Sequence, residues 1–144
     1  MTLYLDTSSL VKLYVDEPGS DEVRGLVDRA RIVATSVIAY AEARSALARL
    51  RREGALPSAA FTSIKRVLDK DWPSYLTLDV TGAISQAAGD LAEQYRLRGY
   101  DSVHLASFLE VARRAGAGET HFSSFDDRLN RAAKAAARSL ARRR

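Results

Sequence analysis

Residues 1–14, MTLYLDTSSLVKLY, contain a short apolar run that ends on an acidic residue. The run at residues 3–5 is typical of a buried strand. Asp6 follows it directly, and three hydroxyl-bearing residues separate Asp6 from the next apolar stretch. An ionised carboxylate at the end of a buried strand loses hydration that nothing local replaces. Asp6 therefore either caps the helix that follows or binds something charged.

Short apolar segments alternate with helical patterns over the rest of the chain. We expect strands at residues 3–5, 32–34, 75–78 and 120–122. Helices are expected at residues 8–15, 20–30, 36–53, 59–71, 82–97, 101–115 and 127–140. This alternation predicts an α/β protein whose parallel sheet is covered by helices on both faces. Ligands of such proteins gather at the carboxyl ends of the strands, which is where Asp6 is expected.

Length and composition exclude several classes of protein. At 144 residues the chain is expected to form a single domain, residues 1–144, with a sizeable core. It contains no cysteine, which excludes disulfides, zinc sites with thiolate ligands and cysteine nucleophiles. No apolar run approaches the ~20 residues of a membrane span. Asp6 interrupts the layout of a signal peptide, so we expect a cytoplasmic protein.

Charge is distributed unevenly along the chain. The net charge is +4, but residues 128–144 contain seven basic residues and no acidic one. The remaining residues hold fifteen basic against eighteen acidic side chains, a net charge of −3. A basic C-terminal helix or tail at residues 128–144 suits contact with a polyanion. On composition alone, the favoured interpretation is a solvated helix end, where the helix dipole attracts cations.

Four acidic residues are hard to explain as ordinary surface residues. Asp6 and Asp126 each follow an expected strand, and Asp101 lies at an expected helix start. Glu42 lies on a helix face whose neighbours are apolar or small. The three aspartates could simply cap helices, and Glu42 could pair with an arginine of another helix. A parallel sheet could instead bring all four to one edge.

A cluster of these four carboxylates would need a cation. Two like charges ~4 Å apart repel by roughly 4 kcal/mol at an effective dielectric near 20. Oxygen ligands without cysteine or clustered histidine select hard cations, Mg²⁺ or Mn²⁺. Because Mg²⁺ prefers one or two carboxylates together with substrate phosphate, such a cluster predicts in-line displacement at a phosphoryl group by a metal-activated water.

The order of these segments resembles that of PIN-domain ribonucleases, and most closely the VapC-type toxins of toxin–antitoxin pairs. The matching segments are DTSSLVKLY with Asp6, SVIAYAEARSAL with Glu42, YDSVHLASFLEVA with Asp101 and HFSSFDDRLNRAA with Asp126. They lie in the family's order across nearly the whole chain. The resemblance implies a three-layer α/β/α sandwich with a short parallel sheet and a Mg²⁺- or Mn²⁺-dependent endoribonuclease site.

The resemblance also implies residue roles and partners. It implies four catalytic, metal-binding carboxylates: Asp6, Glu42, Asp101 and, directly or through water, Asp126. Ser8 and Ser124 would support them, with Ser124 standing where the family more often has threonine. The implied partners are an RNA substrate of the tRNA or rRNA class, a small antitoxin protein and a second copy of the chain. At the place of the family's last strand, this chain continues helical and basic.

Other interpretations remain open on the sequence alone. A phosphoacceptor signalling domain also gathers carboxylates around Mg²⁺, but it needs an early acidic pair, and Asp6 has no acidic neighbour. A catalytically inactive PIN-like protein would only bind a partner. His104 lies one helical turn from Asp101, and we interpret it as a packed or dimer-facing residue rather than a proton shuttle.

Overall fold

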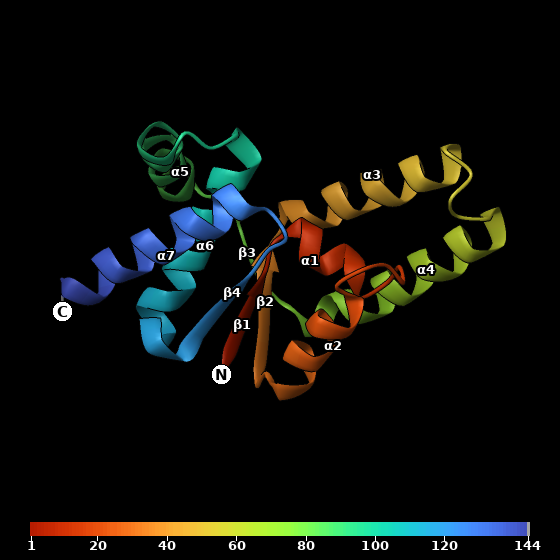
Figure 1. The fold of residues 1–144 in the computed structure, drawn as a ribbon, viewed down its shortest axis with the longest axis horizontal. Helices are drawn as coiled ribbons and strands as arrows, with labels where there is room; N and C mark the ends of the chain where they lie inside the picture. Colours follow the sequence, from red (N-terminus) through yellow and green to blue (C-terminus); the bar gives the residue numbers. More distant parts are fainter. Residues whose placement is uncertain (144) are drawn as a thin grey trace.

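The computed structural model of the chain describes residues 1–143, which contain a four-stranded sheet in the order β3-β2-β1-β4 (Figure 1). The strands are β1 (Thr2–Leu5), β2 (Ile32–Ser36), β3 (Leu76–Leu78) and β4 (Thr120–Ser123). All neighbouring pairs are parallel. The carboxyl ends of all four strands therefore lie at one edge of the sheet.

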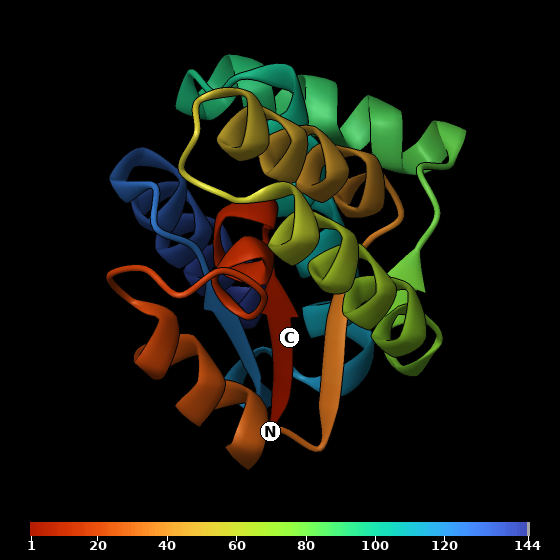
Figure 2. The same cartoon turned by 90° about the vertical axis from the view of Figure 1, so that its right-hand side faces the viewer.

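Helices cover both faces of the sheet (Figure 2). One face carries α1 (Thr7–Lys12), α2 (Ser20–Arg29), α3 (Ile38–Arg52) and α4 (Ser58–Asp71), followed by the 3₁₀ turn η1 (Trp72–Ser74). The other carries α6 (Gly99–Ala115) and α7 (Asp127–Arg142), with α5 (Gly82–Tyr95) packed on α6 and the turn η2 (Ala117–Glu119) before β4. None of these helices, within residues 1–143, is long and apolar enough to cross a membrane. The three-layer α/β/α architecture is confirmed.

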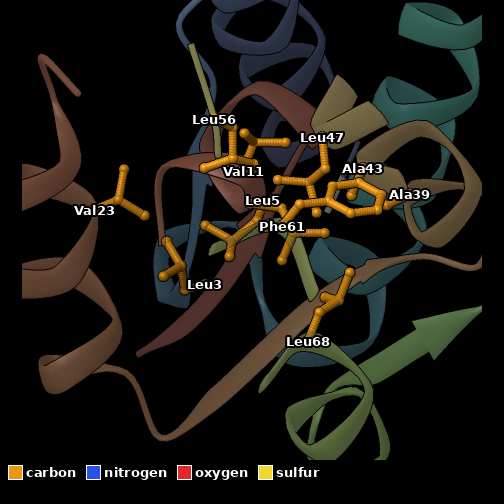
Figure 3. Packing of buried hydrophobic residues seen from close by; sticks show 11 residues of the cluster. Leu3, Leu5, Val11, Val23, Ala39, Ala43, Leu47, Leu56, Phe61 and Leu68 are labelled. Atoms are coloured by element: carbon orange, nitrogen blue, oxygen red, sulfur yellow. The ribbon is translucent and has the colours of Figure 1, made fainter. Parts of the chain in front are cut away.

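Strand β1 is central and is buried on both faces. Leu3 and Leu5 pack into a core cluster with α1, α2, α3 and α4 (Figure 3), whereas Tyr4 packs against α6, α7 and Phe122. All three residues of the run are fully buried. Because successive strand residues point to opposite faces, one continuous apolar run supplies both cores.

The element boundaries differ from the expected ones close to the carboxyl edge of the sheet. Residue 36 belongs to β2 rather than to the following helix, because Ser36 pairs in register with Leu78 of β3. Helix α6 begins at Gly99, which places Asp101 in its first turn. Helix α7 continues to Arg142, and no fifth strand occurs within the residues that the structure describes.

Gly19 provides a test of the packing beside this edge. Its φ angle is +96°, and a Cβ there would lie 2.6 Å from Cε1 of Phe125. We expect Gly19→Ala to lower the free energy of unfolding by about 1–3 kcal/mol, because backbone strain adds to the clash. Urea denaturation would measure this loss. Gly89→Ala is the matched control, since Gly89 lies within α5 with open space around it, and it is expected to stabilise by about 0.5–1 kcal/mol.

Candidate functional site

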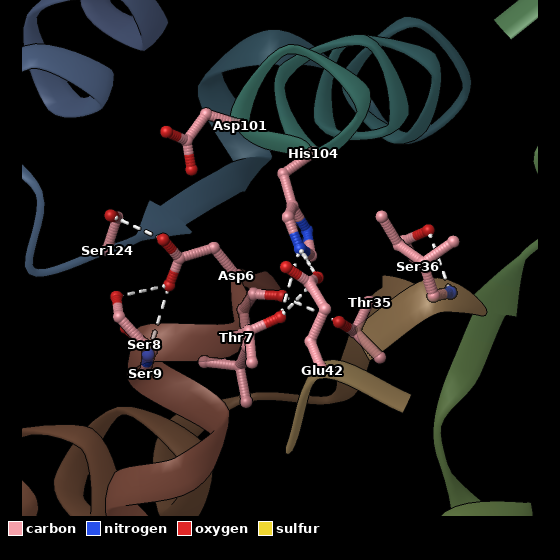
Figure 4. Close-up of polar contacts among 12 residues, drawn as sticks. Asp6, Thr7, Ser8, Ser9, Thr35, Ser36, Glu42, Asp101, His104 and Ser124 are labelled. Carbon is pink, nitrogen blue, oxygen red and sulfur yellow. Dashed lines mark hydrogen bonds and ion pairs between the residues drawn. The ribbon is translucent and has the colours of Figure 1, made fainter. Parts of the chain in front are cut away.

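Asp6 lies at the end of β1 and is held by three donors (Figure 4). Its Oδ1 accepts hydrogen bonds from Ser8 Oγ at 2.7 Å and from the Ser9 backbone N–H at 3.0 Å. Its Oδ2 accepts one from Ser124 Oγ at 2.6 Å. The bond to Ser9 makes Asp6 the N-cap of α1, so the capping interpretation is confirmed. The cap does not explain the third donor, which reaches Asp6 from beyond β4.

Burial makes the charge of Asp6 costly. The residue is only 4% exposed. This desolvation raises its pKa above the ordinary value, although the hydrogen bonds from Ser124, Ser8 and Ser9 and the charge of His104 act in the opposite direction. A bound cation would favour the ionised form, so the surroundings of Asp6 suit a site for positive charge.

Glu42 comes from the first turns of α3 and pairs with a histidine. Its Oε1 accepts a hydrogen bond from Thr7 Oγ1 at 2.7 Å and lies 2.9 Å from Nε2 of His104. On the other side of the imidazole ring, Nδ1 lies 2.9 Å from the hydroxyl of Tyr4. Burial would raise the pKa of Glu42, but the bonds from His104 and Thr7, with the charges of His104 and Arg98, lower it overall. Glu42 is thus kept ionised.

Asp101 approaches the site from the first turn of α6. Figure 4 shows its carboxylate pointing toward that of Asp6. Its Oδ2 accepts a hydrogen bond from Nε of Arg98 at 3.0 Å. The pKa of Arg98 is raised, first by this bond and charge and then by the charges of Asp126 and Glu42. Arg98 therefore lies within electrostatic reach of three of the four predicted carboxylates.

Asp126 lies at the start of α7 and is connected to Asp6 through a serine. Its Oδ1 accepts a hydrogen bond from the Leu129 N–H at 2.8 Å, which makes it the N-cap of the helix. Its own N–H donates to Ser124 Oγ at 3.0 Å, and that hydroxyl in turn donates to Asp6. Ser124 therefore fixes the start of α7 relative to the end of β1.

The structure brings the predicted residues to one edge of the sheet but does not arrange them as a complete set of metal ligands. Among residues 1–143, no three His, Asp or Glu side chains converge so that they could bind a metal ion together. The all-oxygen donor set still fits a hard divalent cation, since Mg²⁺ needs only one or two carboxylates and otherwise keeps its waters. The assignment of Asp6, Glu42, Asp101 and Asp126 as ligands, with Ser8 and Ser124 in support, stays a prediction.

Three residues at this edge contribute to the site although no role in it was predicted for them from the sequence. His104 is only 2% exposed and bridges Tyr4 to Glu42, so it is part of the site's hydrogen-bond network and not merely a packed side chain. Thr7 donates to Glu42, and Arg98 pairs with Asp101. The spacing of His104 and Asp101, one helical turn apart, was the available signal for the histidine. Arg98 lies three residues before Asp101, and this short spacing was the available signal for their ion pair.

Comparisons with known proteins agree with this architecture. A family model described as PIN domain matches residues 3–135. Ribonuclease VapC45 of Mycobacterium tuberculosis (strain CDC 1551 / Oshkosh) is 37% identical over 109 residues, covering 76% of each chain. Ribonuclease VapC49 of Mycobacterium tuberculosis (strain ATCC 25618 / H37Rv) gives the same values. Ribonuclease VapC46 of that strain is 32% identical over 135 residues, covering 92% of this chain and 90% of its own.

A solved structure supports the fold independently of close sequence similarity. The crystal structure of FitAcB from Neisseria gonorrhoeae superposes with a TM-score of 0.62 at 19% sequence identity. The match covers 92% of this chain and 93% of that chain. At this identity the similarity concerns the fold alone, and it extends over nearly the whole chain.

Proposed function

Because this chain belongs to the PIN-domain family and is related over three quarters of its length to ribonucleases of the VapC type, we propose that it is an endoribonuclease dependent on Mg²⁺ or Mn²⁺. The observation that carries the proposal is the Asp6 carboxylate, which is buried at the carboxyl edge of the sheet and faced by Asp101 (Figure 4). Burial disfavours the ionised form of this carboxylate, and a cation bound beside it would compensate its charge.

Asp6 and Asp101 are the residues proposed to hold the metal ion, with Glu42 and Asp126 completing the site directly or through water. A divalent cation bound there would supply Lewis acidity toward the phosphodiester and toward an attacking water. The chain itself supplies orientation: Ser8, the Ser9 N–H and Ser124 fix the two oxygens of Asp6.

Glu42 and Arg98 are proposed to act on the water and on the phosphate. Oε1 of Glu42 is held by Thr7 and His104, while its Oε2 has no hydrogen bond within residues 1–143 and is free to orient a water. The guanidinium of Arg98, which is largely exposed beside Asp101, can approach a phosphate oxygen of the substrate. In-line hydrolysis would leave a 5′-phosphate and a 3′-hydroxyl.

Cleavage of tRNA and rRNA with and without metal tests this proposal. We expect discrete cuts with Mg²⁺ or Mn²⁺, no cuts in EDTA, and product ends that a 5′-phosphate-dependent exonuclease degrades. Asp101→Asn should remove the activity, while Asp28→Asn, on the exposed side of α2, should keep it. Equal cleavage in EDTA would refute metal dependence, and no cleavage under any metal would favour a protein that only binds its partner.

The partners proposed from the same family membership are a small antitoxin protein and a second copy of the chain, in the cytoplasm. These assignments rest on the resemblance to VapC-type toxins. Co-expression with the neighbouring open reading frame, followed by mass spectrometry of the purified protein, would test the first. Light scattering of the purified chain would test the second.

A further inference from the structure

The outer face of α7 carries a continuous stripe of cations. The buried face of this helix packs Leu129, Ala132, Ala133 and Ala136 against the sheet and α6. Five basic residues lie on the opposite face, at three- and four-residue spacing, and all are exposed: Arg128, Arg131, Lys134, Arg138 and Arg142. Residues three and four apart share a helix face, so these side chains form one row. At 1.5 Å per residue the row is about 21 Å long.

These cations are not neutralised by the chain. Within residues 1–143, none of the five forms an ion pair. The one hydrogen bond among them runs from Nη1 of Arg128 to the carbonyl of Arg96 at 3.3 Å. That bond places the inner end of the row beside the segment between α5 and α6, which also carries Arg98. By contrast, several basic side chains of helices α2, α3 and α6 form ion pairs with acidic neighbours.

The row starts at the candidate site and leads away from it. Helix α7 begins beside the carboxyl end of β4 and extends to the C-terminal end of the described chain (Figure 1). Arg131 and Lys134 line a groove of about 430 Å³ that reaches Ser124, the residue that donates to Asp6. Phe125, which is 39% exposed, also lines the groove. Its walls include Glu22 and Asp127, so the charge is mixed near the site and purely positive farther along α7.

We infer that this face of α7 binds the sugar–phosphate backbone of the RNA substrate on one side of the cleaved bond. The inference deepens the proposed function by naming where the substrate lies. An unpaired row of cations fits the regularly spaced phosphates of a polyanion. The residues of the row bind RNA and do not take part in the cleavage step.

Binding measured in EDTA tests the inference separately from catalysis. The probes are fluorescein-labelled oligouridylates of about 20 and about 4 nucleotides, the shorter having fewer phosphates with which to contact the row. The test variant replaces Arg131, Lys134, Arg138 and Arg142 with Gln. The control variant replaces Arg29, Arg31, Arg66 and Lys70, four exposed cations on or near α2 and α4, with Gln. Both variants lose the same net charge, and circular dichroism would check their folding.

We expect the α7 variant to lose about 30-fold or more in affinity for the long probe at low salt, and less for the short one, which makes fewer phosphate contacts. The slope of log affinity against log salt should fall by about 3, since each lost phosphate contact removes roughly 0.7. The control variant should stay close to the wild type. With metal and a long substrate, the α7 variant should show a raised KM and an unchanged kcat.

Two results would overturn the inference. One is an α7 variant whose affinity and salt slope match those of the control variant. The other is an α7 variant that keeps its RNA affinity but loses binding of poly-glutamate, which would assign the face to an acidic protein. A chain that binds the long probe through α7 but never cleaves RNA would refute the proposed nuclease and leave this surface standing. If the protein cleaves RNA but the α7 variant binds and cleaves RNA as the wild type does, the proposed nuclease stands and the α7 surface is refuted.

Discussion

Asp6→Asn is expected to abolish metal-dependent RNA cleavage while leaving the chain folded. Because even an outer partner of a metal ligand is worth about 10–100-fold in activity, loss of a central carboxylate should cost more than about 100-fold. The fold should survive, since an asparagine at this position could accept from Ser9 and Ser8 through its oxygen and donate to Ser124 through its amide. A cleavage assay beside the exposed-surface variant Asp28→Asn measures the effect. An active, normally folded Asp6→Asn protein would contradict the proposed role.

The same variant makes a prediction about stability and pH. Since the pKa of Asp6 is raised in the folded chain, the folded state binds the proton more tightly than the unfolded state does. The contribution of Asp6 to stability is therefore present below its ordinary pKa of 3.8 and is lost as the pH rises through the folded pKa. Asparagine does not titrate, so without metal Asp6→Asn should match the wild type in acid and exceed it near pH 7.5. The size of the gain measures how far the pKa of Asp6 is raised, at about 1.4 kcal/mol for each pKa unit.

Thermal unfolding in EDTA between acidic and neutral pH would measure this difference. The same measurement with added Mg²⁺ tests metal binding, because Mg²⁺ should raise the Tm of the wild type and not that of Asp6→Asn. A variant that is less stable than the wild type at neutral pH in EDTA would show that the charge of Asp6 is already compensated within the chain.

His104→Ala is expected to have the largest effect on stability of any single change at the site. The substitution leaves a cavity and removes the ring nitrogen beside the Tyr4 hydroxyl, while Glu42 keeps only one of its two partners, Thr7. We expect a loss of about 2–4 kcal/mol in the free energy of unfolding. Urea denaturation would measure it, with His121→Ala on the exposed edge of β4 as the control, expected to change stability by less than about 0.5 kcal/mol.

Activity separates a positioning role of His104 from a purely structural one. Because His104 holds Oε1 of Glu42, His104→Ala should lower kcat by about 10–100-fold at a temperature where the variant is folded. Tyr4→Phe is the matched variant, since it removes the bond to Nδ1 but leaves Nε2 on Glu42. It should cost about 1 kcal/mol of stability and little kcat. Equal kcat values for His104→Ala and Tyr4→Phe would mean that His104 acts only through packing.

The order of the helices and strands and the local hydrogen bonds of the site follow from residue patterns along the chain. The continuous apolar run at residues 3–5 predicts a strand buried on both faces, because strand periodicity is a local property. The caps at Asp6 and Asp126 follow from bonds to N–H groups three residues ahead, a spacing that can be read directly from the chain. Carboxylates after two parallel strands were therefore expected at one edge of the sheet.

Which side chains meet at that edge depends on how the distant segments pack together. The bond from Ser124 to Asp6 joins residues 118 positions apart, and the contact between His104 and Glu42 spans 62 positions. Such contacts depend on the crossover of each helix and on strand order, which residue spacing does not encode. The same holds for α7: its basic residues are visible in the sequence, but their alignment beside the groove that reaches Ser124 follows from where α7 packs on the sheet.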